Sequence, residues 1–261
     1  MSELVRLERQ DGVAWITLDR AEVRNALSFD TLGELSAHVA TLAGDSETRV
    51  VCITAAGDKA FCAGADLKER KTFTEEQTRA FVARIGDTFA AVAELPQPTV
   101  AVLNGVAFGG GLELALACDL RVAAEGISVG LTETALAIIP GAGGTQRLPA
   151  VVGVARAKEL ILAARRVPAD EALAMGLLNR VAPAAELRAV AEELAAAIAA
   201  NGPLAVRAAK AAIDLTQSGA PLNERLLAER ALYLERVLPS ADRLEALAAF
   251  QEKRPPRFRG V

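Results

Sequence analysis

Short runs of β-branched and apolar residues alternate with helical patterns from the N-terminus to about residue 155, and turns of glycine and alanine join them. Residues 48–57 predict a buried strand and residues 98–110 a strand and a turn, while residues 28–45 and 74–95 have the apolar spacing of amphipathic helices. Strand, small-residue turn and helix follow one another repeatedly. This alternation favours an α/β fold in which helices cover the faces of a sheet.

Local signals add detail to this α/β pattern. Residues 5–20 alternate and turn at Asp11-Gly12, which predicts a β-hairpin. Ser28 is placed to cap the helix that follows it. Residues 121–130 predict another strand pair, and residues 113–120 predict a short helix that is apolar on all sides.

The pattern changes beyond about Ala155, where helical segments broken by proline and glycine run to the C-terminus. Residues 177–183 predict a short strand there, and the last residues form a basic arm. We therefore expect an α/β core with the active site over residues 1–190 and an α-helical part over residues 191–261.

Composition excludes several classes of function. The net charge of −4 does not favour nucleic acid as the main partner. The odd number of cysteines (Cys52, Cys62 and Cys118) argues against a disulfide framework, and their spacing is not typical of a metal site. The one histidine, His38, is expected on the solvent side of a helix, so the sequence lacks the histidines that a zinc cluster or a histidine-based triad would need.

The sequence gives no sign of a membrane or a secretory route. The first residues are charged and lack the apolar core of a signal peptide. No uninterrupted run of eighteen apolar residues predicts a membrane span. We expect the protein in the cytoplasm or a similarly reducing compartment, without a membrane as its partner.

Three turns of small residues are candidate binding sites, at residues 63–66, 109–111 and 141–144. The first N–H groups of a helix have no partner within it, so such a turn offers donors to an anion or a developing oxyanion. No G-x-x-x-x-G-K-[ST] motif is present, which excludes a P-loop, and no G-x-G-x-x-G motif opens a helix after the first strand.

Two acids lie close to these turns. Glu113 stands between Leu112 and Leu114 in the apolar helix, and Glu133 lies between a strand and another apolar segment. Favourable placement near a helix N-terminus stabilises an acid by only ~0.3–1 kcal/mol, which is too little to offset burial between leucines. The pair therefore suggests two carboxyl groups across a cavity, one acting as an acid and one as a base.

The stretches AFCAGADLKE, NGVAFGGGLELALACDLRVAA and GLTETALAIIPGAGGTQRLP resemble the enoyl-CoA hydratase/isomerase family, also called the crotonase family. Within that family the chain is most similar to the methylglutaconyl-CoA hydratases. The resemblance covers nearly the whole chain. It implies a crotonase-like spiral of ββα units with a C-terminal α-helical trimerisation part.

The resemblance also implies roles for five residues. The N–H groups of Ala65 and Gly110 would hold the thioester oxygen as an oxyanion hole. Glu113 would activate the water that attacks Cβ, and Glu133 would pass a proton to Cα. Gly141 would leave room for that water. Because family members that shift double bonds often keep only one of the two acids, the presence of both favours hydration or dehydration.

Arg70 bears on the substrate, because many simple hydratases of the family are apolar at that position. Arg70, with Lys68 or Lys71 helping and Tyr233 near the acyl pocket, is a candidate to bind a second carboxylate such as that of 3-methylglutaconyl-CoA, in leucine or isovalerate metabolism. The alternative is that KERK is a solvated helix face and the chain is a general short-chain enoyl-CoA hydratase.

The family likeness further implies that coenzyme A is part of the substrate, that no separate cofactor or metal is needed, and that the chain forms a homotrimer or a hexamer of two trimers. The residues that it implies for coenzyme A binding are Arg24, Lys59, Ala60, Ala63, Leu67, Phe250 and Lys253, the last two from a neighbouring subunit. A different class also remains open at this stage, because one branch of the family is named for RNA binding.

Overall fold

The computed structural model describes residues 3–261, and its strands form two sheets. The larger sheet has six strands in the order β1-β2-β3-β5-β7-β10, and the smaller has four in the order β4-β6-β8-β9. The larger sheet consists of β1 (Val5–Gln10), β2 (Val13–Leu18), β3 (Val50–Ala55), β5 (Thr99–Leu103), β7 (Leu120–Ala124) and β10 (Arg180–Ala182). The smaller sheet consists of β4 (Ala60–Cys62), β6 (Val106–Phe108), β8 (Ser128–Gly130) and β9 (Val167–Pro168).

The hairpin predicted at Asp11-Gly12 is confirmed, because β1 and β2 pair antiparallel and both turn residues have positive φ. From β2 onwards, neighbouring strands of the larger sheet are parallel. All five residues of β5 and five of the six residues of β3 are buried. Parallel strands covered on both faces are expected to be apolar throughout, which explains these runs in the sequence.

From β3 to β8, consecutive strands alternate between the two sheets, and this is the repeating feature of the fold. β3, β5 and β7 lie in the larger sheet, while β4, β6 and β8, which follow them in sequence, lie side by side in the smaller one. A helix or a helical turn follows each of the second strands. The predicted strand pair at residues 121–130 is therefore two strands, β7 and β8, that belong to separate sheets and do not pair.

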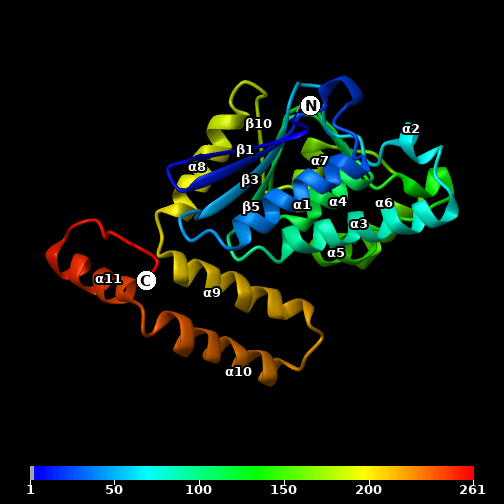
Figure 1. Cartoon of the computed structure of the whole chain (residues 1–261). Helices are drawn as coiled ribbons and strands as arrows, with labels where there is room; N and C mark the ends of the chain where they lie inside the picture. The colour runs from blue at the N-terminus through cyan, green and yellow to red at the C-terminus, as the bar shows by residue number, and fades with distance from the viewer. Residues whose placement is uncertain (1–2) are drawn as a thin grey trace.

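Helices cover the two sheets and extend the chain beyond them (Figure 1). The helices before residue 200 are α1 (Phe29–Ala43), α2 (Leu67–Arg70), α3 (Glu75–Ala93), α4 (Gly110–Ala117), α5 (Gly144–Val152), α6 (Val154–Leu162), α7 (Ala169–Ala174) and α8 (Leu187–Ala199), with 3-10 turns η1 (Ala21–Val23) and η2 (Glu133–Leu136). Ser28 caps α1 as expected, because its side chain accepts a hydrogen bond from the Thr31 N–H.

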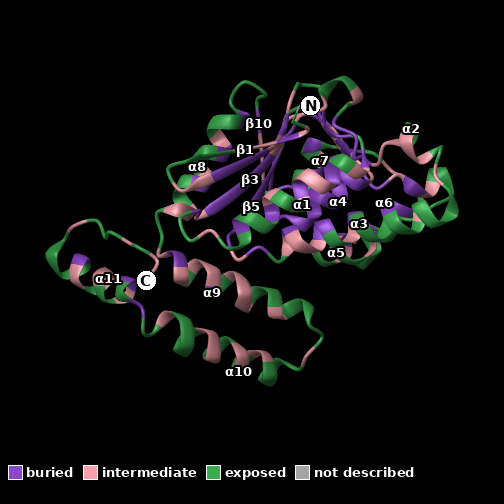
Figure 2. Ribbon diagram, in the orientation of Figure 1, coloured by how far each residue is buried: buried purple, intermediate pink, exposed green. Residues whose placement is uncertain are grey.

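α4 is the central helix of the fold, and all eight of its residues are buried (Figure 2). A Cβ added at Gly111 would lie 2.1 Å from the carbonyl oxygen of Cys62 in β4, so only glycine allows the helix to approach this strand so closely. His38, expected on the solvent side of α1, is instead half-buried, and its Nε2 lies 2.8 Å from the Val5 carbonyl oxygen.

The expected division between residues 190 and 191 falls inside α8. Ala191 and Ala195 of this helix are fully buried, and α8 packs on the larger sheet. The chain leaves the sheet only after Ala199, in α9 (Pro203–Asp214), η3 (Leu215–Gln217), α10 (Leu222–Leu232), the π-helical turn η4 (Tyr233–Val237) and α11 (Ala241–Glu252). α10 has no buried residue, and Leu222 and Leu227 on it are 62% and 61% exposed.

No single helix among residues 3–261 is long and apolar enough to cross a membrane. One pair of segments reaches the length and apolar composition of a membrane span only when the two are taken together. These segments are Leu187–Ala199 and Pro203–Gln217, and they meet at a bend of 102°.

Candidate active site

A cavity of about 640 Å³ opens between α2, α3, the start of α4 and η2. Its wall contains eight of the residues singled out in the sequence: Ala63, Ala65, Leu67, Arg70, Gly110, Glu113, Glu133 and Gly141. These residues come from three separate turns and the segments beside them. The fold thus brings the small-residue turns and both acids to one place.

The turn after β4 presents the Ala65 N–H towards the cavity. Leu27 forms a parallel bridge with Ala65, donating to the Gly64 carbonyl and accepting from the Asp66 N–H. Backbone N–H groups alternate in direction along an extended segment, so these two bonds leave the N–H of Ala65 on the side away from Leu27, and Ala65 lines the cavity. The backbone is close to α4, because a Cβ added at Gly110 would lie 3.7 Å from the Ala65 nitrogen.

The Gly110 N–H is the second donor. Gly110 is the first residue of α4, so its N–H has no partner within the helix. The preceding Gly109 has φ 53° and ψ −126°, a conformation that side chains disfavour. A Cβ there would also lie 3.2 Å from Glu133 Oε1. Glycine at position 109 therefore sets the start of α4 and leaves space for an acid.

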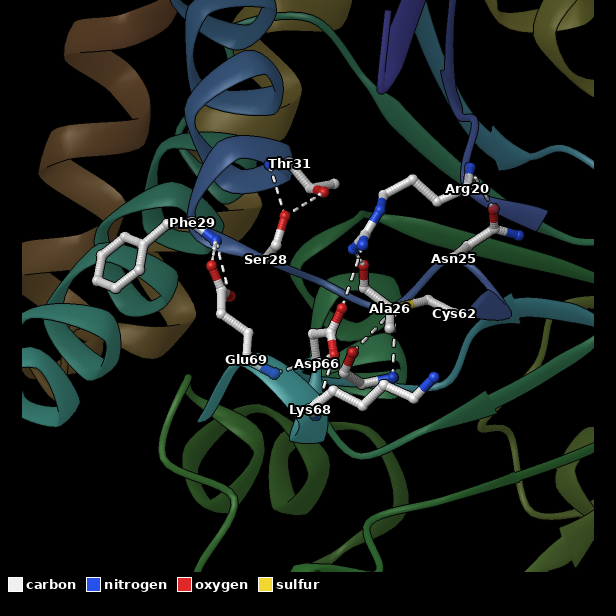
Figure 3. Close-up of polar contacts among 11 residues, drawn as sticks. Arg20, Asn25, Ala26, Ser28, Phe29, Thr31, Cys62, Asp66, Lys68 and Glu69 are labelled. Carbon is white, nitrogen blue, oxygen red and sulfur yellow. Dashed lines mark hydrogen bonds and ion pairs between the residues drawn. The ribbon is translucent and has the colours of Figure 1, made fainter. Parts of the chain in front are cut away.

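Asp66 fixes the turn that carries Ala65 (Figure 3). Its Oδ1 accepts from the N–H groups of Lys68 and Glu69, which caps α2, and its Oδ2 pairs with Arg20 at 3.1 Å. Burial opposes the Asp66 charge, but the hydrogen bonds from Glu69 and Arg20 outweigh it and lower the pKa. The sequence reasoning missed this support, although an aspartate just before a short helix is a recognisable N-cap signal.

Glu113 is 3% exposed and has its own backbone partners. Its Oε1 accepts from the N–H of Ala142 at 2.8 Å and of Gly144 at 2.9 Å. Burial raises the pKa of Glu113, while these two hydrogen bonds and the charge of Arg147 act in the opposite direction. The sequence explained this carboxylate by the cavity alone, and that explanation was incomplete, because the 141–144 turn supplies two donors.

Glu133, the first residue of η2, is in a different environment. It is 8% exposed, and among residues 3–261 its buried Oε2 has no hydrogen-bond partner. Burial and, secondarily, the negative charge of Glu113 raise its pKa to about 7. The two acids are therefore unequal: Glu113 has donors that favour the carboxylate, whereas Glu133 favours the protonated form.

The candidates for binding an acyl carboxylate are separated by the structure. Arg70 is half-buried in the cavity wall, with its guanidinium carbon 5.9 Å from the centre of the Phe81 ring. Lys68 and Lys71 are exposed and do not line the cavity. Tyr233 lies 49% exposed at the start of η4, also away from the cavity of its own chain.

The candidates for binding coenzyme A divide in the same way. Ala63 and Leu67 line the cavity, and Arg24 is adjacent because its carbonyl accepts from the Ala63 N–H at 3.0 Å. Lys59 is exposed at the start of β4, but the neighbouring Ala60 is only 2% exposed, so its methyl group offers little surface to a ligand.

Phe250 and Lys253 belong to the end of α11, on the opposite side of the molecule from α2 (Figure 1). Within one chain they do not reach the cavity. Phe250 is 85% exposed, which leaves its ring available to another molecule. No group of three or more His, Cys, Asp or Glu side chains in the described part of the chain is placed to hold a metal ion.

The chain is similar to known proteins over almost its whole length. Residues 8–261 match the family described as Enoyl-CoA hydratase/isomerase. The putative enoyl-CoA hydratase/isomerase YngF of Bacillus subtilis (strain 168) is 50% identical over 253 residues, 97% of this chain and 96% of that protein. The mitochondrial methylglutaconyl-CoA hydratase of Homo sapiens is 44% identical over 259 residues, 97% of this chain and 75% of that protein.

The structure agrees with these sequence comparisons. It superposes on the crystal structure of an enoyl-CoA hydratase from Bacillus anthracis with a TM-score of 0.97 and 50% identity, covering 99% of this chain and 100% of the other. The α/β fold expected from the sequence, a crotonase-like arrangement of ββα units, is therefore confirmed.

The raised pKa of Glu133 predicts a pH-dependent loss of stability. Between pH 4.5 and about 7 the folded protein keeps a proton that the unfolded chain releases, so the stabilisation by this proton is lost as the pH rises through that window. The shift corresponds to roughly 3 kcal/mol. We expect Glu133→Gln to be more stable than wild type at pH 8, by up to roughly 3 kcal/mol, and to lose that advantage in acid.

Urea unfolding at several pH values measures this difference. Glu125→Gln, at an exposed carboxyl group between β7 and β8, is the matched control and should follow wild type. Identical pH dependence in Glu133→Gln and wild type would show that burial does not penalise the Glu133 carboxylate.

Proposed function

The chain belongs to the enoyl-CoA hydratase/isomerase family, and from this premise we propose that it is an acyl-CoA hydratase. It would add water across the Cα–Cβ bond of an enoyl-CoA thioester, or remove it from the product, with coenzyme A as part of the substrate and no separate cofactor. One observation carries the proposal: two buried acids with different environments line one cavity together with two free backbone N–H groups.

The oxyanion hole would stabilise the negative charge that develops on the thioester oxygen. The N–H groups of Ala65 and Gly110 would donate to the thioester oxygen and stabilise the enolate that forms when Cβ is attacked. Donors that are already in place cost no reorganisation, and one of them typically contributes ~3–4 kcal/mol to lowering the barrier. Asp66 keeps the first donor in position, and the left-handed Gly109 keeps the second.

The two acids would divide the proton transfers. Glu113, as the carboxylate, would take a proton from water while the water oxygen bonds to Cβ, and the Cα–Cβ electron pair would move into the enolate. Glu133, as the neutral acid, would then protonate Cα. The proton left on Glu113 would return to Glu133 through solvent, which restores both groups. A pKa of about 7 for Glu133 suits this role near neutral pH.

The proposal predicts the effect of removing either acid. Glu113→Gln and Glu133→Gln should each lower kcat for hydration of crotonyl-CoA by about 10²–10⁴-fold, because an amide can neither accept nor donate this proton. Absorbance of the enoyl thioester follows the reaction, and circular dichroism checks the fold. Glu76→Gln, at an exposed carboxyl group of α3, is the control. Full activity in either cavity variant would contradict the paired-acid mechanism.

We further propose 3-methylglutaconyl-CoA, or 3-hydroxy-3-methylglutaryl-CoA in the reverse direction, as the substrate, which belongs to leucine or isovalerate metabolism. Arg70 supports this, because a half-buried guanidinium in an otherwise apolar part of the wall can bind a second carboxylate bidentately. The guanidinium carbon of Arg70 lies 5.9 Å from the centre of the Phe81 ring, within reach of a cation–π contact that would help to hold it. The similarity to methylglutaconyl-CoA hydratase agrees with this proposal.

A broad short-chain enoyl-CoA hydratase is the second candidate. The cavity wall contains apolar side chains, including Val82, Leu136 and Ile139, which are 46%, 58% and 69% exposed. These side chains suit an uncharged acyl chain. The two candidates differ in whether Arg70 contacts the substrate.

A homotrimer or a hexamer of two trimers is our proposal for the assembly. Exposed apolar side chains on the C-terminal helices, among them Leu222, Leu227 and Leu244, would be covered in it. In this assembly, Phe250 and Lys253 would contact coenzyme A bound to a neighbouring subunit. Tyr233 would lie beside an acyl pocket. Arg24 and Lys59 would contact coenzyme A bound to their own subunit. The three cysteines are free and buried, which fits a reducing compartment, and we propose the cytoplasm.

Arg70→Ala distinguishes the two substrates. If Arg70 binds the acyl carboxylate, this change should lower kcat/KM for 3-methylglutaconyl-CoA by roughly tenfold or more and leave crotonyl-CoA nearly unaffected. Arg79→Ala, at an exposed arginine of α3, is the control. An unchanged ratio of the two kcat/KM values would discard the carboxylate anchor and favour the broad hydratase.

A further inference from the structure

Arg147 connects the active-site turn to the helix that follows it. It lies in the first half of α5, and its side chain turns back so that Nη1 donates to the Ala142 carbonyl oxygen at 3.0 Å. The same turn donates the Ala142 and Gly144 N–H groups to Glu113. Arg147 therefore holds one side of the turn while Glu113 occupies the other.

The local sequence is adapted to this contact. A cation near a helix N-terminus is disfavoured by the helix dipole, typically by ~0.3–1 kcal/mol, so the helix itself gives no reason for arginine here. Gly143 has φ 107°, and a Cβ added to it would lie 2.1 Å from Arg147 Nη1. Only glycine both adopts this backbone conformation and leaves room for the guanidinium.

The charged groups around Glu113 are few. Glu133 faces it from η2, and Arg70 of α2 lines the same cavity. α3 turns the uncharged Phe81 and Ile85 towards the cavity. From α5, Arg147 is the cation that favours the Glu113 carboxylate.

The remaining charges nearby act elsewhere. The negative charge of Glu94, just after α3, opposes the lowering of the Arg147 pKa by burial. Arg121 of β7 is buried and donates to the carbonyl oxygens of Leu177 and Cys118. Burial lowers the pKa of Arg147 from its ordinary value, and the negative charge of Glu113 is the largest influence opposing this. The charges of Arg147 and Glu113 therefore stabilise each other.

We propose that Arg147 is a positioning residue for Glu113: its guanidinium fixes the Ala142–Gly144 turn through the Ala142 carbonyl, so that the turn keeps its two N–H donors on the Glu113 carboxyl group and favours the carboxylate. The catalytic consequence rests on the proposed hydratase function, in which Glu113 must be ionised to take a proton from water. The structural part concerns the ionisation of one named carboxyl group and is measured without substrate.

Titration of Glu113 tests the structural part. Protein with ¹³C-labelled glutamate carboxyl groups is titrated by NMR as wild type, Arg147→Met and Arg147→Lys, and Glu113→Gln identifies the signal. Removing a nearby cation favours the neutral acid, so Arg147→Met should titrate Glu113 at higher pH than wild type. Arg147→Lys keeps the charge and should stay closer to wild type. Superimposable Glu113 titrations in wild type and Arg147→Met would overturn the proposal.

The pH dependence of kcat provides the second readout. Arg147→Met should lower kcat by roughly 10- to 100-fold through misplacement of the base. The acid limb of the pH profile of kcat reports the ionisation of Glu113 with substrate bound, and in Arg147→Met this limb should move to higher pH. Arg147→Lys should recover the position of this limb. Arg156→Met, at an exposed arginine of α6, is the matched control.

The outcomes separate the two proposals. A fall in kcat with an unmoved acid limb in a folded Arg147→Met protein would leave Arg147 only a structural role and overturn the inference. A wild-type protein without hydratase activity on either enoyl-CoA would overturn the proposed function, and the NMR titration would still decide the role of Arg147. Thermal unfolding identifies a variant that fails to fold; if Arg147→Met does so, Arg147→Gln, which also removes the charge, takes its place in both measurements with the same expected shifts.

Discussion

A carboxylate buried in an apolar helix needs hydrogen-bond donors, and much of the active-site region is arranged to supply them to Glu113. The side chain is 3% exposed within a helix that is buried on all sides. Its donors come from the Ala142 and Gly144 N–H groups, 29 and 31 residues further along the chain. Glycine is required at position 144, because a Cβ there would lie 2.8 Å from both Pro140 Cβ and Leu131 Cδ1 and 3.0 Å from Glu113 Oε1. The start of α5 and the core helix α4 are thereby held together by one acid.

Topology explains why the other parts of the site meet there. β4, β6 and β8 are parallel neighbours in the smaller sheet, so their carboxyl ends lie at one edge. Ala65 follows the first of these strands, Gly110 and Glu113 follow the second, and Glu133 follows the third. Ligands of open α/β sheets characteristically bind outside the carboxyl ends of strands. Each repeat of the fold thus contributes one part of the site.

The sequence predicted the components better than their arrangement. The buried strands β3 and β5 and the amphipathic helices α1 and α3 were readable because their apolar patterns are long. The strands of the smaller sheet have only two or three residues, too few to show a period, so the sheet that aligns the three turns was not predicted.

At the site, unusual side chains could be recognised in the sequence, whereas the roles of backbone groups could not. Glu113 and Glu133 stood out because acids are rare in apolar surroundings, and the structure places both around one cavity. The 141–144 turn was expected to offer N–H donors, but Glu113 was not foreseen as their acceptor, because a pairing of groups 29 and 31 residues apart leaves no mark in the sequence. Positions that depend on the far end of the chain, such as Tyr233 and Phe250, could not be placed relative to the cavity from sequence spacing.

In the proposed mechanism, a water molecule activated by Glu113 supplies the hydroxyl group and Glu133 supplies the Cα proton, both from the side of the substrate that faces the two acids. The most direct test of this mechanism is hydration of crotonyl-CoA in D₂O, followed by proton NMR of the product. The coupling constant between the Cα and Cβ protons shows whether deuterium and oxygen were added to the same face of the double bond or to opposite faces. We expect a single diastereomer, in which deuterium and oxygen have added to the same face of the double bond. Addition from opposite faces, or a mixture of diastereomers, would contradict it.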